Sequence, residues 1–98
     1  METQNAAEMP RYKSHKRVWA LKIKEIAPTF TEVTDTREQV QTGAWIFPEE
    51  SGYAQFHVGQ DYITKHAPKV GGYYVVYADG YKSWSPAQAF EEGYTREN

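Results

Sequence analysis

Alternating apolar and basic side chains mark the first regular element of this chain. From Arg17 onward the apolar positions are Trp19, Leu21 and Ile23, with Lys22 and Lys24 between and after them. This is the period of a half-buried strand, so the pattern predicts that the ring of Trp19 is buried. Pro28 is expected to end the strand.

The next segments are less regular. Residues 29–42 are rich in Thr, Glu, Gln and Asp, with Phe30, Val33 and Val40 as the apolar anchors. We expect a long loop here, with a short strand near 29–34. Two further strands are predicted at 44–47 and 54–58, the second with Phe56 and Val58 on one side and His57 on the other.

A short helix is predicted over residues 60–66. It follows Gly59, and Pro68 ends it because the residue before a proline avoids helical backbone angles.

The block 71–94, GGYYVVYADGYKSWSPAQAFEEGY, predicts a hairpin and then a helix. Asp79-Gly80 lies between two runs of aromatic and β-branched residues, which is typical of a two-residue type I′ turn. Such a turn makes Val75 face Trp84 across the hairpin. Counting outward, one face carries Tyr73, Val75, Tyr77 and Trp84, and the other carries Tyr74, Val76, Ala78 and Tyr81.

The helix after this hairpin has start and stop signals in the sequence. Ser85 is the expected N-cap, Gln88 completes a capping box, and Pro86 suits the first helical position. Gly93 is expected to end the helix in a left-handed conformation.

The order of these elements predicts an α+β fold. We expect a small twisted antiparallel sheet or partly open β-barrel of about five strands, with two short helices. Residues 1–10 are polar and aperiodic and are expected to form a disordered N-terminal tail. Residues 11–98 are long enough for a single α+β domain.

Composition changes this picture in two ways. The chain has no cysteine, which excludes disulfides and thiolate chemistry, while eight Tyr, four Phe and three Trp supply large side chains for a core. No run approaches the length of a membrane span, and the first residues lack the pattern of a secretion signal. We therefore expect a soluble protein with no membrane contact.

Charge is distributed unevenly along the chain. The formal net charge is −2, yet the stretch from Arg11 to Lys24 holds six positive residues and no acid. The interleaving of cations with Tyr12 and Trp19 is a composition found where phosphates and stacked bases are bound. The same stretch is also explained as a basic strand neutralised by acidic neighbours.

No residue pattern points to catalysis. The three histidines, His15, His57 and His66, lack partners at metal-ligand spacing, and no nucleophile motif is present. Gly71-Gly72 is not part of a phosphate-binding motif and is better explained as the turn into a strand. We expect a protein that is not an enzyme and that uses neither a cofactor nor a metal.

The segments YKSHKRVWALKIKEI, near the start, and DYITKHAPKVGGYYVVYADGYKSWSPAQAFEEGYT, at the end, resemble a family of small uncharacterised proteins of tailed bacteriophages and prophages. The resemblance covers most of residues 12–95, and its best motif is the block 71–94. The polar insert at 29–42 and Trp84, where a smaller aromatic is expected, depart from the family pattern. The resemblance implies the cytoplasm of a bacterial host and assigns no catalytic or binding residues.

These observations predict a non-enzymatic accessory phage protein that binds a host or phage protein, as an inhibitor of a host process or defence system. Tyr and Trp often anchor protein interfaces, and the expected contact residues are Tyr77, Tyr81 and Trp84. The alternative is a nucleic-acid or small anionic-ligand binding protein. Its expected contact residues are Arg11, Lys13, Lys16, Arg17, Lys82 and Ser85, the last at a helix start.

Overall fold

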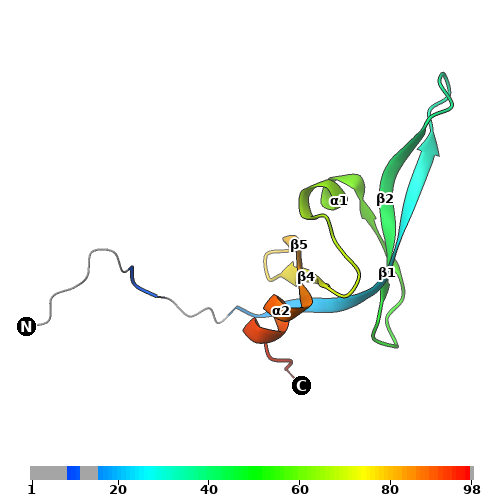
Figure 1. Ribbon diagram of the computed structural model, residues 1–98. Coiled ribbons are helices and arrows are strands. Elements are labelled where there is room, and N and C mark those ends of the chain that lie inside the picture. Colours follow the sequence, from blue (N-terminus) through cyan, green and yellow to red (C-terminus); the bar gives the residue numbers. More distant parts are fainter. Residues whose placement is uncertain (1–8, 12–15, 98) are drawn as a thin grey trace, which may run out of the picture.

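In the part of the chain that the structure describes, five strands form one antiparallel sheet, accompanied by two short helices (Figure 1). The computed structural model describes residues 9–11 and 16–97. Along the chain the elements are β1 (Val18–Glu32), β2 (Gln39–Pro48), β3 (Phe56–Gly59), α1 (Gln60–His66), β4 (Tyr73–Tyr77), β5 (Lys82–Ser85) and α2 (Ala87–Gly93). The strand order is β3-β2-β1-β4-β5, and the sheet is open, not closed. The predicted α+β fold is confirmed.

The long strand β1 belongs to both halves of the sheet. Its first residues, Val18 to Lys22, pair with β4, and its remainder pairs with β2. The register against β2 shifts between Ile23 and Glu25, at the point where β1 changes partner. A bulge of this kind bends a strand and increases its twist. One strand can therefore serve two half-sheets that point in different directions.

Pro28 does not end β1, and residues 29–42 are not a long loop. Pro28 lies inside the strand, opposite Ala44 of β2. Among the described residues, β1 has no strand partner on its other side at this point, so the missing N–H of Pro28 leaves no ladder bond unmade. The strands continue to Glu32 and from Gln39, and they form a two-stranded ribbon that projects from the body (Figure 1).

The core lies between the sheet and α1. Ile23, Ile46, Val58 and Tyr62 are buried together, with Phe56, Tyr74 and Trp84 among the residues packed against them. The predicted orientation of β3 is confirmed, because Val58 is buried and His57 is exposed. Trp19 was expected in the core but is 60% exposed, because it lies near the outer end of β1, opposite Val76.

Helix α1 has the predicted boundaries and crosses the opening of the sheet. It contacts β2, β3 and β5. The hydroxyl of Tyr62 donates a hydrogen bond of 2.7 Å to the backbone carbonyl of Ser83 in β5. Burial raises the pKa of this phenol above its usual range, so it stays a donor at any physiological pH. Tyr62 thus links α1 to β5, which forms the opposite edge of the sheet from β3.

The β4–β5 hairpin forms, but its register differs from the prediction by one residue. Tyr74, not Val75, faces Trp84. The loop has three residues, Ala78 to Gly80: the N–H of Gly80 bonds to the carbonyl of Tyr77, and Gly80 has a φ of 90°. This is the type I turn with a following left-handed glycine that a three-residue hairpin uses. Trp84 therefore shares a face with Tyr74 instead of Tyr77.

Helix α2 begins one residue later than expected and lacks the predicted caps. Pro86 is the N-cap, and Ser85 lies in β5 with its hydroxyl bonded to the carbonyl of Pro86. Gln88 bonds to Glu92, not to the helix start. The helix ends at Gly93 with Tyr94 in an extended conformation, so no left-handed glycine closes it. Packing, not capping, must hold this short helix.

Candidate binding surfaces

The loop between β4 and β5 gathers aromatic rings and cations. The rings of Tyr77 and Tyr81 stack with centroids 6.0 Å apart and an interplanar angle of 29°. The ammonium group of Lys16 lies 5.7 Å from the Tyr77 ring, and that of Lys65 lies 5.0 Å from the Tyr81 ring. Such distances are those of cation–π contacts. We call this set, together with Arg17 and Asp79, the tyrosine groove.

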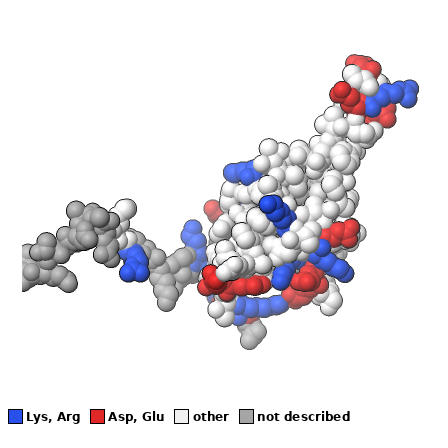
Figure 2. Space-filling view, in the orientation of Figure 1, with Lys and Arg blue, Asp and Glu red and all other residues white. Residues whose placement is uncertain are grey.

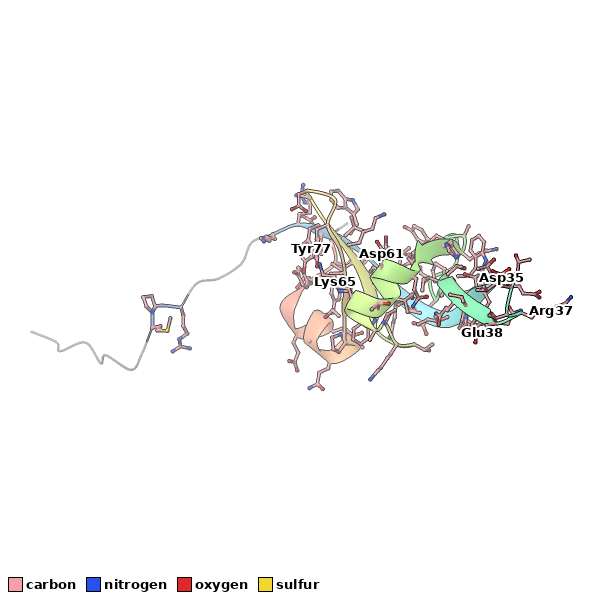
Figure 3. All side chains as sticks on the ribbon, turned by 90° about the horizontal axis from the view of Figure 1, so that it is seen from above. Asp35, Arg37, Glu38, Asp61, Lys65 and Tyr77 are labelled. Carbon is pink, nitrogen blue, oxygen red and sulfur yellow. The ribbon has the colours of Figure 1, made fainter. Side chains whose placement is uncertain are left out.

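The tyrosine groove contains a cavity of about 580 Å³ that opens to solvent and is lined by its members other than Lys65, together with Ala78. Tyr81 is 44% exposed and Tyr77 is half-buried. Asp79 uses one carboxylate oxygen to accept the backbone N–H of Tyr81 at 2.9 Å, which holds the loop in shape. Figure 3 shows Tyr77 and Lys65 in the body of the molecule, far from the tip of the β1–β2 ribbon.

Trp84 does not join Tyr77 and Tyr81, contrary to the predicted three-residue patch. Its ring packs against the core cluster on the other face of the hairpin. The ring lies directly over Gly72, and its indole N–H has no hydrogen-bond partner among the described residues. Trp84 therefore has a structural role. The register shift places Tyr77 on the same face as Tyr81, whereas the predicted register placed it on the same face as Trp84.

The cations of the predicted anion site are partly separated. Lys16 lies in the tyrosine groove, and so does Arg17, whose guanidinium pairs with Glu97 at 2.7 Å. Lys82 is exposed on β5 opposite Val76, and Ser85 bonds to a carbonyl instead of offering its hydroxyl at a helix start. Arg11 is exposed on a described segment before β1, and Lys13 falls outside the described residues.

Ion pairs attach the C-terminal segment to the body. The guanidinium of Arg96 makes two hydrogen bonds to Glu50, of 2.8 and 3.0 Å, and this contact lowers the pKa of Glu50. Lys22 lies 3.6 Å from a carboxylate oxygen of Glu91 and 4.0 Å from one of Glu49. The second interpretation of the basic segment, that acidic neighbours neutralise it, therefore holds for Arg17 and Lys22.

Aromatic stacking holds α2 on the sheet. The Phe90 ring lies between Tyr73 and Tyr94, at 4.2 and 4.7 Å between centroids. The Tyr73 hydroxyl donates to Glu91 at 2.7 Å, and this hydrogen bond raises the pKa of Tyr73 to about 12. These contacts line a groove of about 970 Å³ between the first half of β1 and the C-terminal segment.

The β1–β2 ribbon exposes apolar side chains at a distance from the core. We call residues 29–42 the arm. Phe30 is 55% exposed, Val40 45% and Val33 38%. Charged side chains gather at its tip, where Figure 3 labels Asp35, Arg37 and Glu38, and the shaft below the tip is uncharged on the face that Figure 2 shows.

Sequence reasoning missed two parts of these surfaces. Lys65 reaches Tyr81 only because α1 folds across the sheet, and nothing in the local pattern links the two residues. The arm was only partly predicted: the short strand expected near 29–34 is present as the continuation of β1 to Glu32, but Pro28 was expected to separate it from the first strand. The alternation of Thr29, Phe30, Thr31 and Glu32 was the available signal for a strand continuing beyond it.

Within the described residues, no cluster of three or more histidine or acidic side chains is placed to hold a metal ion. The described residues also contain no helix that is long and apolar enough to cross a membrane. No protein-family model matches this chain, and comparison with curated proteins and with solved structures found no similar protein.

Proposed function

We propose that this chain is a non-enzymatic accessory protein of phage or prophage origin that binds a host or phage protein through its arm. The observation that supports the proposal is the exposure of Phe30, Val33 and Val40 on a ribbon of only two strands. The contact surface differs from the predicted patch of Tyr77, Tyr81 and Trp84, because Trp84 packs against the core cluster.

An isolated two-stranded ribbon is only marginally stable in water, because it has no third strand or helix to cover its apolar side chains. The arm extends a well-packed sheet, but beyond Ile23 no described strand pairs with the free edge of β1. The free edge of β2 is likewise unpaired before Gly43. Both edges offer N–H and C=O groups to a partner strand, which is the basis of recognition by β-augmentation.

The charged tip supports a specific partner over self-association. Glu32, Asp35, Arg37 and Glu38 are exposed around the tip. Charges at the end of an exposed ribbon disfavour edge-to-edge pairing of identical chains. The partner expected for the arm is therefore a protein that presents an apolar cleft or an unpaired strand and carries a basic rim, since three of these four charges are negative.

The test compares two tagged variants with the parent chain in cell extracts of an infected bacterial host. Phe30→Ser combined with Val40→Ser removes the two most exposed of the three apolar side chains named for the arm, and Tyr53→Ser removes a ring of similar exposure, 51%, outside it. We expect the parent and Tyr53→Ser to retain one partner protein and the arm variant to lose it. Retention of the same partner by the arm variant would contradict the proposal.

A second measurement shows whether the arm variant loses its partner simply because it is unfolded. Exposed substitutions away from special backbone sites change stability by about 0.5 kcal/mol or less. Urea unfolding of the arm variant should therefore match that of the parent chain. The dissociation constants of the purified partner with the parent chain and with the arm variant then give the loss of affinity in the absence of other extract components.

A further inference from the structure

We infer that the tyrosine groove binds single-stranded nucleic acid, as a second site separate from the arm. Two cations, Lys16 and Arg17, line the groove beside the two stacked rings, and Arg17 also pairs with Glu97. A third cation, Lys65, lies 5.0 Å from the Tyr81 ring. Sites for single strands are built from these two components: aromatic faces on which bases stack, and cations that follow the phosphates.

The rings have the orientation that stacking needs. Tyr77 and Tyr81 are nearly parallel, at 29°, and their loop is held by the bond from the Tyr81 N–H to Asp79 and by the backbone pair of the two tyrosines. The Tyr81 ring also meets the edge of His66, with centroids 5.9 Å apart. A base that stacks on such a preformed surface immobilises few side chains on binding.

The cations lie next to the rings and not in a separate patch. Lys16 lies on the segment before β1, and Lys65 lies on α1. The ammonium group of each lies over the ring of a different tyrosine. A base that stacks on either ring takes the place of the ammonium group over that ring, and the flexible lysine stem lets the ammonium group contact the neighbouring phosphate. Asp79 lines the groove and its carboxylate accepts a backbone N–H, and Glu97 pairs with Arg17.

These features favour a single strand over a duplex or an acidic protein. A duplex offers its phosphates but hides the faces of its bases, so the tyrosines would gain nothing from it. An acidic peptide would satisfy the cations and leave both ring faces uncovered. A single strand uses the rings and the cations together.

The position of the groove in the fold is consistent with this assignment. The chain forms three strands, then a helix, then a hairpin, and its sheet order is β3-β2-β1-β4-β5. This connectivity is that of an open OB-type barrel. In that architecture the loop between the fourth and fifth strands is one of those that contact oligonucleotides. The fold alone assigns no function, so the side chains of the groove carry the inference.

Fluorescence anisotropy of the full chain with labelled dT20 tests the proposal. Tyr77→Leu combined with Tyr81→Leu should weaken binding about tenfold or more, because each stacked base contributes a factor of about 5 to 100. Lys16→Gln combined with Lys65→Gln should weaken binding and flatten its salt dependence by about 1.4 in the log–log slope, since each phosphate contact contributes about 0.7. Circular dichroism confirms that each variant is folded.

The matched controls are Tyr53→Leu, Lys69→Gln and the arm variant Phe30→Ser with Val40→Ser, all of which change exposed residues outside the groove. We expect these three to bind dT20 as the parent does. The inference is overturned if dT20 does not bind at low salt, if the groove variants bind as well as the controls, or if a duplex binds as tightly. It is also overturned if polyglutamate displaces dT20 at an equal concentration of charge.

Discussion

Replacing Gly72 by alanine should destabilise the protein through a clash with Trp84. Gly72 is buried, and an added Cβ would overlap Cζ2 of the Trp84 ring and lie only 2.5 Å from Cε2 and Nε1. Optimal separations between non-bonded heavy atoms are about 3.5–4.0 Å, so the side chain or the backbone must move by about 1 Å.

Neither group is free to move by that amount. The Trp84 ring packs against the core cluster, and the backbone of Gly72 accepts a hydrogen bond of 2.8 Å from the N–H of Ile23. Inserting a methyl group into a packed site costs about 1–3 kcal/mol. With three atoms of a rigid ring affected, we expect a loss near the upper end, about 3 kcal/mol in the free energy of unfolding.

Urea unfolding followed by tryptophan fluorescence and far-UV circular dichroism measures this loss. Trp84→Leu removes the aromatic ring that the new Cβ would meet, so in that background Gly72→Ala should cost less than about 1 kcal/mol. Gly93→Ala is the control, since no atom lies within 4 Å of its added Cβ. It should be neutral or stabilising by up to about 1 kcal/mol.

The reasoning is refuted if Gly72→Ala leaves the free energy of unfolding unchanged. It is also refuted if the cost of Gly72→Ala is the same with leucine at position 84, because the strain would then arise from the backbone and not from the ring.

Three further predictions concern other contacts. Glu91→Gln should lower the pKa of Tyr73 from about 12 toward 10, which an ultraviolet titration of the phenol measures. The raised pKa stabilises the fold below pH 10, and this stabilisation is lost as the pH rises through 12. The variant should therefore lose less stability than the parent chain between pH 10 and 12. Phe90→Ala should speed amide exchange throughout α2 and leave the core strands protected, because the ring stack is what holds this short helix. Gly43→Ala should cost more than about 3 kcal/mol in urea unfolding, since φ is 149° and the Cβ would overlap the Val58 carbonyl oxygen. Wild-type values in any of the three measurements would contradict the corresponding contact.

The sequence was sufficient where a local signal decides the structure. Gly59 and Pro68 delimit α1 without help from the rest of the chain, and the prediction of residues 60–66 is confirmed. The hairpin at Asp79-Gly80 is confirmed as well, but not its register. This dipeptide suits either a two-residue loop or a three-residue loop with Gly80 left-handed, and the bond from the Tyr81 N–H to Asp79 belongs to the latter.

Elsewhere the result depends on partners that local patterns do not reveal. Whether Pro28 stops a strand depends on whether a neighbour requires its N–H, and β4 is too short to reach it. Whether Trp19 is buried depends on how far the core extends along β1. The candidate site shows the same limit: Tyr77 and Tyr81 were predicted as surface contacts, but Lys65 comes from α1 and joins them only in the folded chain.

The sharing of β1 between two half-sheets also sets an order for folding. Its second half meets β2 through a tight reversal at residues 33–38, whereas its first half must wait for β4, which is made much later in synthesis. Closing a short loop loses less chain entropy than closing a long one, so we expect the β1–β2 hairpin to form first in folding. On the ribosome, the basic start of β1 would therefore remain without its strand neighbour until nearly the whole chain had emerged.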